Sequence, residues 1–472
     1  MTKRRHLGFL LVVLCLVTSA CGARLSKEQV AAANGAGAAN GTGTGAAAGS
    51  GTKTTTAAPA AGSGTAGPAA GAPGAAAADP NAAAPGADPA AAAGGGGGAC
   101  APAPGSTDPG VSDTEIKLGN ISTISGPVPG FGQTGQNGVK AYFNYINSQG
   151  GVCGRKLTLV TSDDRLDAGT NRSETERLSK EVFGFVGDTT VVDDGGADVL
   201  TGSIADCSLS IGAKRRASPN NFSPNPIDPN GNGNGTVGIF SWLKANMGLT
   251  KVAVVYPAQA DARTSGQAYV ADIQAAGLAV AGPYEVAVTE TNYAGVASKI
   301  KTDAADGVIT TLEVNGMAKL AQAFKQIGYT PKVPFYGAQA YGQQFLSLAG
   351  DAAEGTVLVL TYAIFEDAGS NPAVQSFVDW YQRSNPGSKP DFFSVMSWAA
   401  ADMMVQAIQA AGPAPTRDKV LAALGTFTAF DAHGFMAPRN PAGKKIGDQF
   451  LVVKVQGGKW VRQFPDAGFS AG

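Results

Sequence analysis

The chain has 472 residues, with 35 Lys and Arg side chains against 36 Asp and Glu side chains and a formal net charge of −1. The sequence holds no cluster of Lys and Arg, which a nucleic-acid partner or an anionic membrane surface would require, so neither partner is expected. The 2 histidines are too few for a metal centre built from several histidines, and we expect neither a metal nor another cofactor.

Residues 1–20 have the pattern of an export signal. Basic residues stand at 3–5, and an apolar run follows at 7–17. This run is shorter than the ~20 residues that a membrane-spanning helix needs, and it fits the apolar part of a secretory signal peptide. Removing the signal takes out three basic and no acidic residues, which leaves 32 basic against 36 acidic residues and a net charge of −4.

The segment TSAC at 18–21 resembles the lipobox of bacterial lipoproteins, in which a cysteine after small residues receives a lipid. We therefore predict an extracytoplasmic chain that is anchored to the bacterial cell membrane by a lipid on Cys21. No later apolar segment is long enough to span a membrane, so this lipid is the only expected anchor. A plain secretory signal with an ordinary thiol at Cys21 is the alternative. The pair Arg4-Arg5 leaves the export route open between the Sec and twin-arginine pathways.

The segment 31–105 is composed almost wholly of Ala, Gly, Pro, Thr and Asn, without one Leu, Ile, Val or aromatic residue. Such a segment cannot bury enough apolar surface to offset the entropy that ordering costs. We predict a disordered tether over 21–112, with a root-mean-square reach of roughly 50 Å for its low-complexity part. An inert low-complexity insertion is the alternative, and it predicts the same disorder.

Three cysteines remain once Cys15 leaves with the signal and Cys21 carries the lipid. In an oxidising compartment three cysteines allow one disulfide and one leftover thiol. Cys100 lies in the predicted tether, whereas Cys153 and Cys207 lie in the folded part of the chain. We therefore predict a Cys153–Cys207 disulfide.

From about residue 113 to residue 465, short apolar runs alternate with longer segments of helical pattern. The predicted strands are 116–121, 156–161, 183–186, 252–256 and 307–310, and the predicted helices are 135–149, 172–181, 265–276, 293–304 and 318–326. This alternation predicts parallel sheets with helices on both faces. About 350 residues are too many for one such sheet, so two lobes are expected.

The glycines at 130, 132 and 135 have the spacing of a dinucleotide-binding loop. Pro127 and Pro129 separate them from the first strand, however, where that motif requires an immediate turn. Asp163 follows about thirty residues later, instead of the ~20 at which such sites place their acid. Nucleotide binding is therefore not favoured, although a Gly-rich loop at the start of a helix suits any anionic or polar ligand group.

Enzyme chemistry has little support in this sequence. After signal removal His433 is the single histidine, so any Ser–His pair would depend on it. The segment GFSAG at 468–472 matches a nucleophile elbow, but no helix follows to hold the turn. Asp163 and Asp164 are adjacent at a strand end, where they are expected to cap or face solvent. We predict that the chain is not an enzyme.

The segment 116–164 resembles the opening of the type I periplasmic binding proteins, the group that binds branched-chain amino acids. The matching features are the loop Ser125-Gly126-Pro127, the pair Phe131-Gly132, the pair Asn137-Gly138, the element INSQGGVCGRK at 146–156 and the Asp pair after the second strand. Further on, VAVVY at 252–256, FYGAQAYGQ at 335–343 and GDAAEGT at 350–356 resemble segments of the second lobe.

The resemblance implies an α/β fold of two Rossmann-like lobes with parallel sheets, joined by three crossover strands. It places lobe 1 at 113–236 and 362–445 and lobe 2 at 237–361 and 446–466. Such proteins close on a solute in the cleft between the lobes and deliver it to the membrane permease of an ABC importer. A ligand-sensing receptor or surface protein of the same fold, without transport, is the alternative.

The resemblance also implies ligand-binding positions in the first lobe. Phe131 corresponds to an apolar wall of the cleft. Thr189 and Thr190 follow the third strand, where relatives hold the carboxylate of the ligand, although Asp193-Asp194 replace the usual Ser-rich run. Core packing is the alternative for Phe131, and a turn that caps the next helix is the alternative for the two threonines.

In the second lobe, the acid that pairs with the ligand ammonium in relatives corresponds to Gln339, which carries no charge. Glu313 follows another strand and is expected to supply a carboxylate instead, and Tyr341 is expected to close the rim. A helix cap is the alternative for Glu313, and a surface loop is the alternative for Gln339. The predicted solute is therefore a branched-chain amino acid, an amide or a urea-like compound.

Overall fold

The computed structural model describes residue 103 and residues 106–128, 130–227 and 233–471. The predicted signal, Cys21, Cys100 and nearly all of the predicted tether lie outside the described residues. No helix in the described part of the chain is both long enough and apolar enough to cross a membrane.

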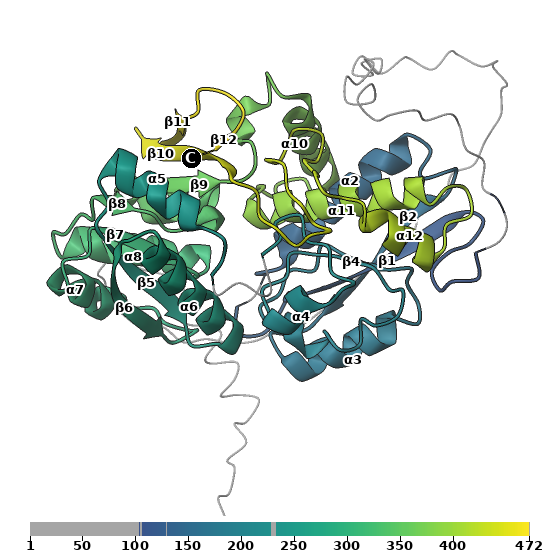
Figure 1. The fold of residues 1–472 in the computed structure, drawn as a ribbon, viewed down its shortest axis with the longest axis horizontal. Coiled ribbons are helices and arrows are strands. Elements are labelled where there is room, and N and C mark those ends of the chain that lie inside the picture. The colour runs from purple at the N-terminus through teal and green to yellow at the C-terminus, as the bar shows by residue number, and fades with distance from the viewer. Residues whose placement is uncertain (1–102, 104–105, 129, 228–232, 472) are drawn as a thin grey trace, which may run out of the picture. The chain divides into compact units, whose positions relative to one another are not determined.

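The first sheet has four parallel strands in the order β2-β1-β3-β4 (Figure 1). On β1, Ile116 and Leu118 are fully buried in the core that contains α2, whereas Ile121 is buried on the opposite face with Leu178 of α3. Burial on both faces is what a parallel sheet covered by helices requires. The bounds are β1 Glu115–Ser122, β2 Lys156–Asp163, β3 Phe185–Val186, β4 Asp206–Cys207, α2 Gln133–Ser148, α3 Ala168–Leu178 and α4 Ala213–Ala217.

Three further helices belong to this α/β unit, and α10 and α11 both pack on α2. Close packing of α2 on α11 depends on Gly138, because a Cβ there would lie 2.3 Å from the carbonyl oxygen of Ser394. The bounds are α10 Pro372–Ser384, α11 Phe392–Ala410 and α12 Arg417–Leu424.

The second sheet also has four parallel strands, in the order β6-β5-β7-β8. On β5, Val252 and Val254 are buried in the core that contains α5 and α6, whereas Ala253 and Val255 are buried in the core that contains α7 and α8. The bounds are β5 Lys251–Pro257, β6 Ala279–Val286, β7 Gly307–Thr310, β8 Val333–Pro334, α5 Val237–Met247, α6 Ala260–Ala275, α7 Ala294–Thr302, α8 Val314–Gln326 and α9 Gln343–Ala349.

An antiparallel group of strands follows the second sheet. The strand β9 (Val357–Leu360) pairs with β10 (Gln449–Gln456), and β10 also pairs with β11 (Lys459–Phe464) and β12 (Ser470–Ala471). A parallel bridge between Phe335 and Val357 joins this group to the end of β8. The chain thus passes between the two α/β units three times: between α4 and α5, between β9 and α10, and between α12 and β10 (Figure 1). The predicted two-lobed parallel α/β fold is confirmed, and the antiparallel group is an addition to it.

The predicted Cys153–Cys207 disulfide is wrong. Cys207 is a free thiol that is fully buried on β4, whereas Cys153 is disulfide-bonded. Cys153 lies just before β2, and β2 and β4 are the two edges of the first sheet. Three strand spacings amount to ~14 Å, far beyond the Cα separation of ~4–7 Å that a disulfide allows. The described residues contain no other cysteine, so the partner of Cys153 lies outside them.

Candidate functional site

The loops at the carboxyl ends of the strands of both sheets surround one cavity of about 810 Å³. Carboxyl ends of parallel strands are the usual ligand-binding edge of an open α/β sheet. The start of α3, the segment after β3 and α4 supply residues from the first sheet, and the start of α6 supplies residues from the second (Figure 1). The polar lining residues are Arg172, Asp194, Asp198, Lys214 and Gln259, and the remaining ones are Ala168, Gly169, Val191, Val192, Gly195 and Ala260.

The segment after β3 is fixed from behind by the end of β1. Thr189 forms a parallel bridge with Ser122, and its backbone N–H donates to Ser122 Oγ at 3.0 Å. Thr190 Oγ1 lies 3.1 Å from Thr123 Oγ1 and accepts from the backbone N–H of Val192 at 3.2 Å. Both threonines are buried, with 4% and 2% of their surfaces exposed. They position Val191 and Val192 at the cavity wall and do not line it themselves.

The two acids at the end of β2 serve the loop architecture. Asp163 accepts from the backbone N–H of Ile124 at 2.9 Å and from Ser125 Oγ at 2.5 Å, and these hydrogen bonds, opposed by burial, lower its pKa to about 2. Asp164 is fully buried and accepts from Thr123 Oγ1 at 2.7 Å. Neither carboxylate lines the cavity.

The other predicted site residues lie apart from the cavity lining. The ring of Phe131 packs edge-on against Phe393 at 4.8 Å between centroids. Glu313 caps α8, because its carboxylate accepts from the backbone N–H groups of Asn315 and Gly316 at 2.7 and 2.6 Å. Gln339 is half-buried in the 3-10 turn Ala338–Ala340. Their contacts with a solute remain predictions.

Tyr341 has 1% of its surface exposed, and its hydroxyl is fully engaged. The hydroxyl donates to Glu366 Oε2 at 2.6 Å and accepts from the backbone N–H of Phe365 at 2.7 Å. Tyr341 thereby holds the segment that follows β9, the second passage of the chain between the two units. Its predicted place at the rim remains a prediction.

Charged groups surround the loop behind the cavity. Asp193, with 2% of its surface exposed, accepts from the backbone N–H groups of Ile211 and Gly212 at 3.0 and 2.8 Å. Asp194 Oδ1 accepts from the backbone N–H of Arg215 at 2.9 Å. These contacts tie the turn after β3 to the start of α4, so that Asp194 and Lys214 face the same cavity.

A buried ion cluster lies below this loop. The Arg215 guanidinium, 1% exposed, pairs with Asp188 at 2.6 Å and with Asp206 at 2.8 Å. Burial raises the pKa of Asp188 to about 7. The charge of Arg215 lowers this pKa and the charge of Asp206 raises it, but burial is the largest effect. Burial also acts on Asp206, but there the charge and hydrogen bonds of Arg215 prevail and its pKa is lowered. Through these ion pairs, Arg215 holds together the loops that carry the lining residues.

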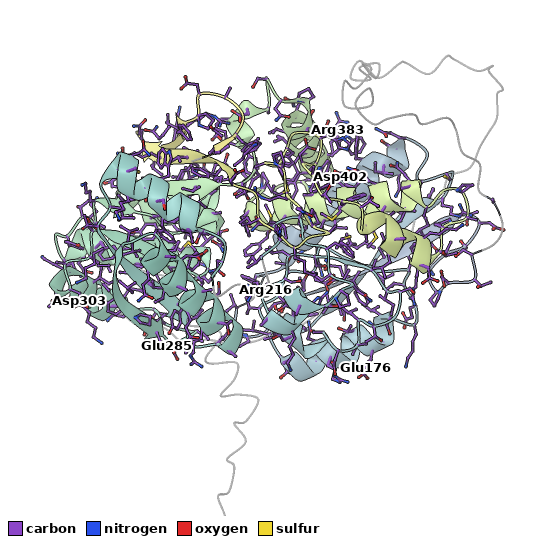
Figure 2. The ribbon with its side chains drawn as sticks, in the orientation of Figure 1. Glu176, Arg216, Glu285, Asp303, Arg383 and Asp402 are labelled. Atoms are coloured by element: carbon purple, nitrogen blue, oxygen red, sulfur yellow. The ribbon has the colours of Figure 1, made fainter. Side chains whose placement is uncertain are left out.

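Sequence reasoning missed the five polar lining residues. Arg172 binds the Asp198 carboxylate, and its Nε lies 3.0 Å from Glu176, the α3 residue labelled at the outer edge of Figure 2. Lys214 makes no ion pair with the described residues. The one indication of this wall in the sequence was the Asp193-Asp194 pair, which lies in a segment of otherwise mostly small and apolar residues. Gln259 has no comparable signal, because its place depends on how the second sheet faces the first.

The sequence and the fold are both similar to known solute-binding proteins. A model of the periplasmic binding protein family matches residues 115–459. The Leu/Ile/Val-binding protein homolog 3 of Brucella melitensis is 23% identical over 306 residues, which cover 63% of this chain and 80% of that protein.

Two solved structures share the fold. The fatty acid ABC transporter substrate-binding protein from Thermomonospora curvata aligns with a TM-score of 0.65 and 18% identity, over 75% of this chain and 92% of that chain. The solute-binding protein of an ABC transporter from R. palustris, solved in complex with benzoate, aligns with a TM-score of 0.62 and 20% identity, over 76% of this chain and 98% of that chain.

Proposed function

The chain belongs to the type I periplasmic binding proteins of the branched-chain amino-acid ABC transporter family, and from this premise we propose that it captures a small polar solute for an ABC importer. The solute class is a branched-chain amino acid, an amide or a urea-like compound. Members of this family bind solutes and are not enzymes, and the proposed partner of this chain is the permease in the membrane.

One observation carries the proposal. The cavity of about 810 Å³ takes its lining from the strand ends of both parallel sheets, so a solute in it would contact both α/β units at once. A ligand that touches two units stabilises the arrangement in which both contacts exist, and this differential affinity drives closure. The volume lies within the ~300–1,000 Å³ that small-molecule sites occupy.

Members of this family are extracytoplasmic. We propose in addition that a lipid on Cys21 anchors this chain to the membrane. A lipid and a long tether raise the effective concentration of the domain near its permease without fixing its orientation. Fractionation of cells that express Cys21→Ala tests the anchor. We expect the variant to be released from the membrane and uptake to fall. A variant that stays membrane-bound, or that is released with uptake undiminished, would count against the anchor's role.

A thermal-shift screen of the purified chain tests solute capture itself. A ligand that binds only the folded state raises the melting temperature, and the shift grows with ligand concentration. We expect a saturating shift with at least one compound among the amino acids, amides and urea. The names of the similar proteins refer to different ligands: one to Leu/Ile/Val, another to a fatty acid and a third to benzoate. No shift with any of these compounds would contradict the proposed function.

A further inference from the structure

The loop after β4, behind the cavity wall, has backbone N–H donors that the chain's own carboxylates already occupy. Ile211 and Gly212 donate to Asp193, and Arg215 donates to Asp194 Oδ1, all within 3.0 Å. A carboxylate brought by a solute would find none of these three donors free. At the wall itself it would instead meet the negative charge of Asp194.

Gly212 permits this self-occupied arrangement. A Cβ on Gly212 would lie 2.2 Å from Asp194 Oδ1 and 2.7 Å from Asp193 Oδ1, closer than real contacts allow. Glycine at this position therefore lets both carboxylates reach the backbone. The close fit on this side fixes the direction of the Asp194 carboxylate at the cavity wall.

Asp194 keeps one oxygen for a ligand. It lines the cavity, and its Oδ2 accepts no hydrogen bond from the described residues, because Oδ1 alone receives the Arg215 N–H. Asp198 lines the same cavity, but its carboxylate is bound by Arg172. Asp194 Oδ2 is thus the acceptor of this wall that a solute can pair with.

Lys214 is the lining cation without an ion pair among the described residues, and its side chain is exposed on α4. An exposed ammonium on a flexible stem attracts a carboxylate only weakly, because water and salt screen it. A solute carboxylate is therefore tolerated near Lys214, whereas an N–H donor is held firmly by the more enclosed Asp194.

We propose that Asp194 selects the solute by accepting a hydrogen bond from an N–H-bearing group, an ammonium or an amide, so that carboxylic acids without such a group are poor ligands. This inference rests on the proposed function, because it requires that a solute occupies the cavity. It separates amino-acid-like solutes from simple acids such as fatty acids and benzoate. Asp194 is a specificity-determining residue in this account, and Asp193 is the positioning residue beside it.

Isothermal titration of the purified chain with three matched probes tests the inference. The probes are L-isoleucine, 2-methylbutylamine, which lacks its carboxylate, and 3-methylpentanoate, which lacks its ammonium. We expect L-isoleucine and 2-methylbutylamine to bind more tightly than 3-methylpentanoate. Asp194→Asn keeps an oxygen for the Arg215 N–H, and we expect it to weaken amine binding about 10- to 100-fold, as loss of a charged hydrogen bond does.

Asp351→Asn is the matched control, because it removes an exposed carboxylate that lies outside the cavity lining. We expect it to change amine binding less than about threefold. Equal binding of 3-methylpentanoate and L-isoleucine, unchanged in Asp194→Asn, would overturn the inference and leave solute capture standing. Failure of all three probes and of amides and urea would instead contradict the proposed function and this inference with it.

Discussion

The hydroxyl of Tyr142 donates to Asp402 Oδ1 at 2.6 Å and thereby links α2 to α11 inside the core. Asp402 has 1% of its surface exposed, and Gln406 Nε2 donates to its other oxygen at 3.0 Å. Figure 2 labels Asp402 on α11, away from the loops that line the cavity. A buried carboxylate is tolerated only when donors surround it, so this pair holds together the helices on which the first sheet packs.

Tyr142→Phe removes the donor of the shorter hydrogen bond and leaves the buried Asp402 carboxylate with one hydrogen bond fewer. We expect the free energy of unfolding to fall by about 1–3 kcal/mol, the cost of an unsatisfied buried partner. Urea denaturation at neutral pH measures it. Tyr269→Phe is the control, since the Tyr269 hydroxyl makes no hydrogen bond with the described residues; it should change stability by less than about 0.5 kcal/mol. Equal effects of both changes would refute the role of the pair.

His433 lies at the open side of the same carboxylate, with Nε2 3.3 Å from Asp402 Oδ1. The hydrogen bond with Asp402 raises the pKa of His433 despite partial burial. Because the pKa is raised on folding, the stabilisation is fully present below the unfolded value of ~6.5 and is lost as the pH rises through the folded value.

His433→Gln should therefore cost more stability at about pH 5.5 than at about pH 8.5. The side chain is 36% exposed, so solvent screening limits the difference to less than ~1 kcal/mol. Urea denaturation of both proteins at the two pH values gives the comparison. A cost that is larger at the higher pH would contradict the assigned sign.

Asp188 is an acid, unlike His433. Burial and the charge of Asp206 raise its folded pKa to about 7, against the lowering effect of Arg215. The folded state thus holds a proton that the unfolded chain has already released above ~4, so stability falls as the pH rises from about 4 to 7. Asp188→Asn removes this loss. Relative to the wild type, the variant should become more stable from about pH 5 to about pH 8, as measured by denaturation. A constant difference would show that Asp188 stays charged throughout.

The two cysteines in the described residues, Cys153 and Cys207, are expected to differ in their reactivity. Cys207 is fully buried and free, and burial raises its pKa, so it should react with iodoacetamide only after unfolding. Cys153 should react only after reduction. Peptide mapping identifies the partner of Cys153, for which Cys100 is the candidate, because Ala103 O accepts from Arg155 Nη2 at 3.0 Å beside Cys153. Labelling of Cys207 in the folded protein would contradict its burial.

The sequence predicted the fold where burial produces a visible pattern. The run at 252–256 was found because β5 is buried on both faces, and a continuous apolar run is the signature of such a strand. The run at 183–186 pairs only over Phe185–Val186, because a strand this short carries little signal. Strand order is not visible in a pattern of residues, which is why the cysteine pairing was wrong.

The candidate site was harder to predict, because its residues come from loops of two separate sheets. Glu313 follows a strand as a ligand-binding acid would, yet its carboxylate caps α8, and both roles have the same local sequence. Asp194 was visible as part of an unusual acidic pair, but the cavity it faces also needs Gln259 from the second sheet. That juxtaposition depends on tertiary structure.

A crystal structure of the chain with a bound solute tests the central claim most directly. We predict that the solute lies in the cavity lined by Arg172, Asp194, Lys214 and Gln259, with an N–H group of the solute within ~3.2 Å of Asp194 Oδ2. A solute bound elsewhere, for example between Phe131 and Gln339 with Asp194 facing only water, would contradict the account.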